Sequence, residues 1–182
     1  MESDKIKIKR LLFLDIDGVM TSVEDGTSLW NCDPPSYSIS STATENLFSI
    51  LDPTDTKVVI HSSWVKWKDN PDYMYVYISP TGEKFAFESL LFNLISLLKE
   101  EGKYVDCTHH ESRRTKRGDI EDWLANNKWL LSDDCKIAIL DDDGWMELDK
   151  VKFDGHEIKF FECDTRTGLT SQIAEDVKNF LG

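Results

Sequence analysis

The stretch Leu11-Leu12-Phe13-Leu14-Asp15-Ile16-Asp17-Gly18-Val19 decides the fold, because an apolar run passes directly into two acids and a glycine. A short apolar run with polar neighbours is typical of a strand that is buried on both faces. Alternate residues of an extended segment point the same way, so Asp15 and Asp17 can share one site. Gly18 lets the chain turn sharply, with backbone N–H groups facing a pocket.

Five short apolar runs along the chain can each form a buried strand. They cover Ile6–Asp15, Lys57–His61, Lys103–Cys107, Lys136–Leu140 and Glu157–Cys163. Segments of helical period lie between and after them, at Thr42–Leu51, Phe87–Glu101, Ile120–Leu124 and Ile173–Leu181. Alternating strands and helices predict right-handed crossovers and a parallel sheet covered on both faces. We expect one α/β domain over residues 1–182, a Rossmann-like three-layer sandwich with a mainly parallel five-stranded sheet.

The composition is that of a folded globular protein without a membrane partner. No apolar run approaches the ~20 residues that a membrane span needs, and the N-terminus has no signal-peptide core. The four cysteines form no C-x-x-C pair and no zinc-site spacing, so we expect a reducing, cytoplasmic setting. The formal net charge of −13 opposes broad binding to a phosphate backbone.

Three consecutive acids, Asp141, Asp142 and Asp143, directly follow the apolar run that ends at Leu140. Ligands of parallel sheets bind beyond the carboxyl ends of the strands, where these acids can meet Asp15. Acids packed together repel one another unless a cation offsets their charge. Mg²⁺ typically takes one or two carboxylates plus waters and substrate oxygens. Asp141 and Asp142 with Asp15 fit that requirement, whereas Asp143 is expected to face solvent.

The two acids at the end of the first strand can divide the work of phosphoryl transfer. One carboxylate can attack phosphorus and form an aspartyl-phosphate. The other can protonate the leaving oxygen and then deprotonate the attacking water. On its own, D-x-D-G also fits an Asp-rich turn or a calcium loop.

Polar groups follow two further elements of the predicted fold. Ser62 and Ser63 follow the second strand, where a hydroxyl can hold a phosphate oxygen; His61 lies in the strand register and is expected to be structural. The basic segment that ends in Lys116 and Arg117 precedes a helix, and a cation there can neutralise phosphoryl charge. A solvated basic loop is the alternative for that segment.

The order of these features resembles the haloacid dehalogenase-like hydrolase superfamily, from about Lys7 to the end of the chain. The resemblance implies that Asp15 is the nucleophile and Asp17 the general acid/base, since the ion-pumping members usually carry Thr at the second position. It also implies Mg²⁺ as the cofactor, at a site formed by the acids of the first and fourth strands. The site residues that it implies are, for catalysis, Asp15, Asp17, Ser62 and Arg117; for substrate binding, Gly18, Ser63 and Lys116; and for the metal, Asp15, Asp17, Asp141 and Asp142. Ser63 is the alternative to Ser62, and Lys116 the alternative to Arg117.

Within that superfamily the chain is most similar to a small subgroup found in RNA-repair proteins and phages. The shared motifs are D-x-D-G-V at Asp15–Val19, S-S-W at Ser62–Trp64, R-G-x-x-I-x-x-W-L at Arg117–Leu124 and G-L-T at Gly168–Thr170. The subgroup often has Arg after the Trp, whereas this chain has Val65, with Lys66 and Lys68 nearby.

The intervals after the first and second strands leave no room for a full cap domain, so we expect a minimal cap or none. The resemblance implies that capless members often act on macromolecular phosphates, or use another subunit to close the site. Aromatic residues in these intervals can stack on a base, or they can pack in a small hairpin or a dimer contact. These aromatic residues are Trp30, Tyr37, Trp67, Tyr73, Tyr75 and Tyr77.

These features predict a Mg²⁺-dependent phosphatase that acts on a nucleotide or on a nucleic-acid terminal phosphate. The alternatives are a phosphatase of a small non-nucleotide metabolite, with the site closed in a homodimer, and a non-catalytic protein that sequesters a phosphorylated ligand.

Overall fold

The structure, a computed structural model of the chain, contains the five-stranded sheet that the sequence predicts. It describes residues 7–29, 36–63, 65, 76–78, 84–86, 88–108 and 115–182. All pairings in this sheet are parallel, and the strand order is β7-β4-β1-β8-β9. The strands are β1 (Ile8–Leu14), β4 (Lys57–Ile60), β7 (Tyr104–Cys107), β8 (Leu131–Asp141) and β9 (Glu157–Glu162).

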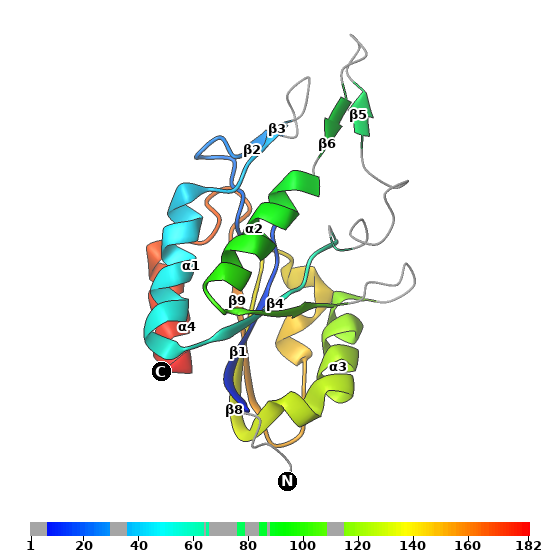
Figure 1. Cartoon of the computed structure of the whole chain (residues 1–182), viewed down its shortest axis with the longest axis vertical. Helices are drawn as coiled ribbons and strands as arrows, with labels where there is room; N and C mark the ends of the chain where they lie inside the picture. Colours follow the sequence, from blue (N-terminus) through cyan, green and yellow to red (C-terminus); the bar gives the residue numbers. More distant parts are fainter. Residues whose placement is uncertain are drawn as a thin grey trace.

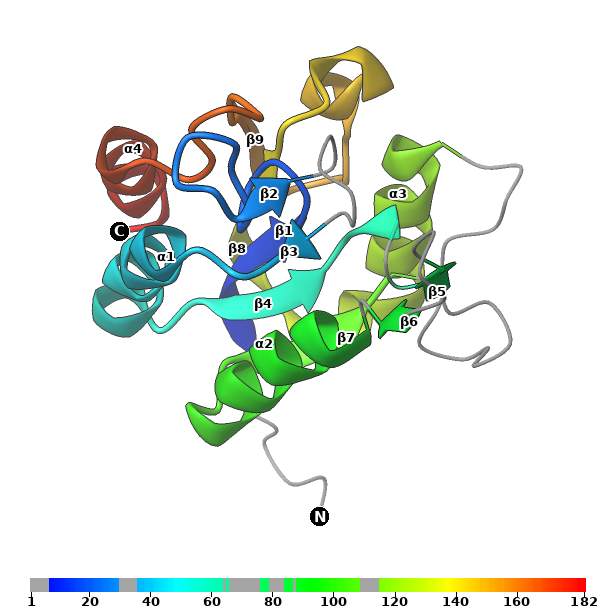
Figure 2. The same ribbon diagram turned by 90° about the horizontal axis from the view of Figure 1, so that it is seen from above.

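Among the described residues, four α-helices complete a three-layer sandwich and confirm the expected fold class (Figure 1). They are α1 (Ser41–Thr54), α2 (Glu88–Glu100), α3 (Lys116–Asn127) and α4 (Ser171–Leu181). Figure 2 shows α1, α2 and α4 on one side of the sheet and α3 on the other. The apolar core is divided in the same way, because Leu12 and Leu14 of β1 pack towards α1, α2 and α4, whereas Leu11 and Phe13 pack towards α3.

β8 begins five residues before the predicted start at Lys136. Its first residue, Leu131, pairs with Ile8, and Lys136 then pairs with Arg10, so β8 takes five steps where β1 takes two. The extra residues form a bulge of mainly polar side chains, which carry no apolar strand signal. From Lys136 onward the register with β1 is regular up to Leu140.

Two short hairpins lie beyond the carboxyl ends of the sheet strands (Figure 1). β2 (Ser28–Leu29) pairs with β3 (Ser36–Tyr37), and β5 (Val76–Ile78) pairs with β6 (Lys84–Ala86), both antiparallel. Among the described residues no larger element is inserted after β1 or β4, in line with a minimal cap.

Each of three helices begins at a hydroxyl side chain that accepts a hydrogen bond from its first turn. The capping residues are Ser40 for α1, Thr115 for α3 and Thr170 for α4. None of the helices described is long and apolar enough to cross a membrane. Cys107, Cys135 and Cys163 are buried and form no disulfide among the described residues, and Cys32 lies outside those residues.

Candidate active site

The candidate site lies where the strand order reverses. β1 stands between β4 and β8, and the chain continues outward from it in both directions. The ends of these three strands lie level with one another, because Asp15 N donates to Leu140 O (3.0 Å) and His61 N donates to Leu14 O (2.8 Å). Such a switch point is where open α/β sheets bind their ligands.

Strand register brings three polar side chains to one face of the sheet. Phe13 is in register with Val59 and Ile139, and all three pack in the core on the α3 side. Because side chains alternate along a strand, the residues two positions later face the same side. These residues are Asp15, His61 and Asp141, and each is at most 3% exposed.

Lys116 supplies the positive charge between the two buried acids. It is the first residue of α3, and Thr115 caps the helix by accepting from Gly118 N (3.2 Å). Lys116 Nζ lies 2.7 Å from Asp15 Oδ2 and 2.9 and 2.8 Å from the two oxygens of Asp141. One ammonium group therefore pairs with two carboxylates that would otherwise repel each other.

Arg117 does not lie at this cluster. The sequence analysis preferred Arg117 to Lys116 as the cation of the site, whereas the geometry places Lys116 there. Its guanidinium group lies 2.8 Å from Glu121 and 3.6 Å from Glu147. Consecutive residues of a helix are rotated by about 100° about its axis. With Thr115 as the cap, Lys116 faces the sheet and Arg117 faces away from it.

Burial and neighbouring charges shift the pKa values of Asp15 and Asp141 in opposite directions. Burial, followed by the neighbouring Asp141, raises the pKa of Asp15 to about 6, against the opposing effect of Lys116. For Asp141, burial favours the neutral acid, but His61 and Lys116 hold its pKa below the ordinary value. Asp141 is thus the firmly ionised member of the pair, and a bound cation would favour ionisation of both.

The acids that follow β1 and β8 can hold a metal ion. Asp15, Asp141 and Asp142 each offer one oxygen, and these oxygens lie within 4.8 Å of one another. Ligand oxygens on opposite sides of an octahedral Mg²⁺ are about 4.2 Å apart, so the three donors fit one ion after small side-chain rotations. The carboxylate of Asp17, which the sequence also suggested as a ligand, is not part of this group.

Asp17 is instead held by Thr21 in the turn that follows β1. The backbone N–H groups of residues 19, 20 and 21 all donate to Ile16 O, which closes one tight turn. Thr21 Oγ1 donates to Asp17 Oδ1 (3.1 Å) and accepts from Gly18 N (3.2 Å). Thr21 is fully buried, and no motif in the sequence pointed to it.

Two other segments of the chain, one at Asp142 and one at Gly168, pack tightly against this turn. Gly18 has φ +69°, and a Cβ atom there would overlap the Asp142 carboxylate. Thr165 Oγ1 donates to the same carboxylate (2.8 Å). In the second segment, Leu169 N donates to Val19 O (2.9 Å), and a Cβ on Gly168 would lie 2.9 Å from that oxygen. The G-L-T motif therefore supports the turn that carries Asp17.

We expect Gly18→Ala to weaken metal binding and to lower stability. A methyl group would displace Asp142 and would impose a left-handed conformation on a residue with a side chain, which costs about 1–3 kcal/mol. Thermal unfolding at a series of Mg²⁺ concentrations measures both effects. Gly26→Ala is the control, because Gly26 also has a positive φ (+72°) but has no atom within 4 Å of the added Cβ. Equal Mg²⁺ dependence in the two variants would contradict the role assigned to Gly18.

The two serines after β4 differ in their exposure. Ser62 is 4% exposed at the strand end, whereas Ser63 is exposed. Next to them, the His61 ring packs edge-on against Phe13, and its Nε2 lies 3.4 Å from Asp141 Oδ2. Neither ring nitrogen has a well-aligned hydrogen-bond partner among the described residues. His61 is therefore a buried neighbour of the acids rather than a residue outside the site.

Most of the aromatic residues of the two intervals lie outside the described residues. Trp30, Trp67, Tyr73 and Tyr75 lie outside the described residues, as does Trp64 of the S-S-W motif. Tyr37 and Tyr77 belong to β3 and β5, whose side chains are not described.

Comparison with known protein families gives a match over most of the chain. The family model described as the HAD domain in Swiss Army Knife RNA repair proteins matches residues 11–174. This range includes all the acids, Lys116 and both serines of the candidate site. No curated protein and no solved structure matches the chain.

Proposed function

Because this chain belongs to the family of HAD domains in Swiss Army Knife RNA repair proteins, we propose that it is a Mg²⁺-dependent phosphatase that forms an aspartyl-phosphate on Asp15. Membership places the chain among phosphatase-type hydrolases and confirms the resemblance drawn from the sequence. The observation that carries the finer proposal is the convergence of Asp15, Asp141 and Lys116 at the strand switch point.

Asp15 is the proposed nucleophile. Its Oδ1 accepts from Ile16 N (2.8 Å) and its Oδ2 from Lys116 (2.7 Å), which fixes the plane of the carboxylate. One oxygen attacks phosphorus as the bond from phosphorus to the leaving oxygen breaks. Water then attacks the acyl-phosphate, which releases phosphate and restores Asp15.

Lys116 and the acids supply the electrostatic environment for this transfer. Lys116 neutralises part of the charge that Asp15 and the phosphoryl group bring together, and it orients Asp15 at the same time. Asp15, Asp141 and Asp142 would hold Mg²⁺. Bound there, Mg²⁺ would supply positive charge that offsets the charge of the phosphoryl group. Ser62, buried at the end of β4, is the proposed hydroxyl contact for the phosphoryl group.

Asp17 is the proposed general acid for the leaving oxygen and general base for the water. It lies two residues beyond Asp15, on the turn held by Thr21. Its carboxylate lies outside the group of acids that can share a metal, so it stays available for proton transfer.

The proposed substrate is a phosphate at the end of a nucleic-acid strand. Two observations support this choice: the family match to domains of RNA repair proteins, and the small size of the elements that the described residues form after β1 and β4. A site without a large cap would admit a polymer end, whereas a small metabolite gains more from an enclosed site.

The test is phosphate release from a panel of substrates: 3′- and 5′-phosphorylated oligonucleotides, mononucleotides and sugar phosphates. Each reaction is run with Mg²⁺ and with a chelator. We expect Mg²⁺-dependent release from oligonucleotide ends. Release from sugar phosphates but not from oligonucleotides would contradict the substrate class, and release unchanged by the chelator would contradict the metal requirement.

Thr21→Val should impair proton transfer while it keeps the shape of the turn. Loss of the hydroxyl removes a hydrogen bond to a charged group, for which we expect a fall in kcat of about tenfold or more. The fall should be larger for alkyl phosphates, whose leaving group needs a proton, than for aryl phosphates. Thr21→Ser, which keeps the hydroxyl, is the matched control. Equal losses for both substrate types would show that Thr21 acts only on folding.

A further inference from the structure

Trp145 leaves a large apolar side chain in water. It is 95% exposed, whereas the next most exposed large apolar residue among those described, Trp129, is 57% exposed. An isolated exposed apolar residue is common on protein surfaces, so exposure alone implies little. The position of Trp145 in the fold and the hydrogen bonds of its backbone turn are more informative about its role.

Trp145 stands at the rim of the candidate site. It lies in a 3₁₀ turn at Gly144–Met146, three residues after Asp142, so their Cα atoms are at most about 11 Å apart. Hydrogen bonds join this turn to the buried acids. Asp143 N donates to Asp141 Oδ1 (2.8 Å), and Trp145 N donates to Asp143 Oδ1 (3.2 Å).

Side chains from two elements contact the turn. Glu147, which ends the turn, adopts a left-handed conformation with φ 56°. Its carboxylate lies 2.7 Å from Lys150 and 3.6 Å from Arg117 of α3. Arg117, which does not reach the buried acids, thus lies beside this turn. A fixed backbone lowers the entropy cost of binding through the exposed ring.

We propose that Trp145 is the stacking platform for the nucleobase next to the phosphate that is removed. This inference rests on the proposed function and names the part of the substrate that the site reads. A net charge of −13 gives the chain little attraction for a phosphate backbone. Affinity for a strand end must then come from elsewhere, and stacking on an aromatic ring provides it for any base.

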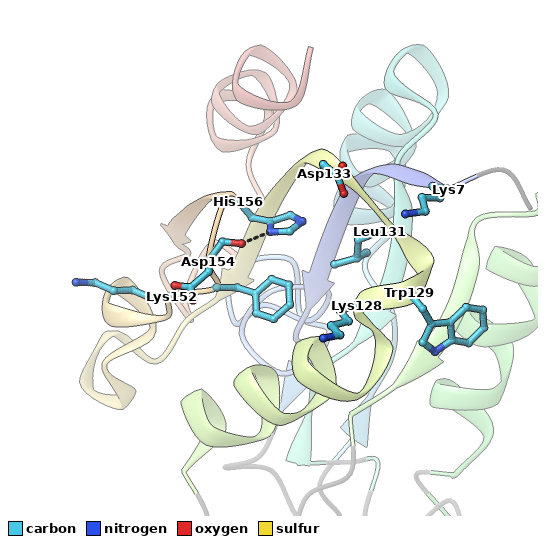
Figure 3. A pocket seen from close by; sticks show the side chains of 9 residues that line it. Lys7, Lys128, Trp129, Leu131, Asp133, Lys152, Asp154 and His156 are labelled. Atoms are coloured by element: carbon cyan, nitrogen blue, oxygen red, sulfur yellow. Dashed lines mark hydrogen bonds between the residues drawn. The ribbon is translucent and has the colours of Figure 1, made fainter.

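Trp129 offers a matched control at the other end of the sheet. It lines a cavity of about 620 Å³ together with Lys128 and Leu131, at the start of β8 (Figure 3). Leu131 pairs with Ile8 and Leu140 pairs with Leu14, so six steps of β1, about 20 Å in an extended strand, separate the two ends of β8. A base stacked beside the acids cannot contact Trp129.

The test compares Trp145→Ala, Trp145→Phe and Trp129→Ala on two oligonucleotides. Both carry the terminal phosphate, and one has a stable abasic analogue as its terminal nucleotide. We expect Trp145→Ala to raise KM for the intact end by about 5- to 150-fold, the range for loss of one stacked base, with kcat unchanged. Trp145→Phe should recover most of this loss, and Trp129→Ala should match the wild type. On the abasic end, the wild type and Trp145→Ala should have the same KM.

An equal rise in KM on the abasic end, or no rise on either end, would overturn the role of Trp145. The same holds if sedimentation shows that the wild type is a dimer and Trp145→Ala a monomer, because Trp145 would then be a subunit contact. Hydrolysis of small phosphates without any of oligonucleotides would overturn this inference and leave the phosphatase chemistry standing. If the wild type releases phosphate from no substrate, both proposals fall.

Discussion

Asp15→Asn should abolish phosphate release, with a fall of at least about a thousandfold. The amide keeps the size of the carboxylate, and its oxygen can still accept from Ile16 N. It cannot act as the nucleophile, because it carries no negative charge. Lys116 keeps its contacts with Asp141, so the surrounding structure should persist.

The stability of Asp15→Asn separates loss of chemistry from loss of fold. The folded state raises the pKa of Asp15 to about 6, from an ordinary value near 3.8. At pH 7 without metal, ionised Asp15 is therefore less favourable in the folded state than in the unfolded state, which lowers the free energy of unfolding. This destabilisation disappears as the pH falls below about 4, because Asp15 is then protonated in both states. The variant should be at least as stable as the wild type at pH 7. Near-normal turnover in a folded variant would contradict the mechanism, and thermal unfolding with phosphate release provides both readouts.

Lys116→Met should lower both activity and stability, and Mg²⁺ should restore part of the stability. The substitution leaves two buried carboxylates facing each other, and removal of one partner from a buried ion pair costs about 3–5 kcal/mol. The Lys116 side chain is 14% exposed, so a value near the lower end is expected. Loss of the cation should also lower kcat by about a hundredfold or more. Denaturant unfolding with chelator and with Mg²⁺, together with steady-state kinetics, tests both effects.

Arg117→Gln is the matched control for Lys116→Met. The two residues are adjacent in the first turn of α3, but Arg117 pairs with the exposed acids Glu121 and Glu147. Exposed pairs of this kind contribute little to stability. We expect kcat on small phosphates within a few-fold of the wild-type value, in contrast to the loss at Lys116. The reverse ranking of the two variants would restore Arg117 as the catalytic cation.

The sheet could be predicted from sequence because its central strands are apolar on both faces. The run Leu11–Leu14 and the run Ile137–Leu140 are fully buried, so their composition directly reports their place in the core. The acids that follow each run could then be assigned to one edge from topology alone. The start of β8 could not be predicted, because its bulged residues are polar and pair irregularly with β1.

Other parts of the site depend on geometry that composition does not encode. The choice between Lys116 and Arg117 depends on which residue begins α3, and a shift of one residue turns a side chain by about 100°. Thr21 contacts Asp17 because the turn after β1 closes on Ile16 O, and nothing in the spacing of the acids requires a hydroxyl there. Strand register places His61 beside Asp141, and the expectation that it is structural stays a prediction.

The most direct measurement is a search for the covalent intermediate on Asp15. Asp17→Asn should be mixed with an aryl phosphate and Mg²⁺, since an aryl leaving group departs without a proton, whereas hydrolysis of the intermediate needs the base. Acid quenching and peptide mass analysis would then locate the phosphoryl group. We predict phosphate on the peptide that contains Asp15. We predict none in the double variant that carries both Asp17→Asn and Asp15→Asn. Phosphate release by Asp17→Asn with no phosphorylated peptide at any time point, or a phosphoryl group on another residue, would contradict Asp15 as the nucleophile.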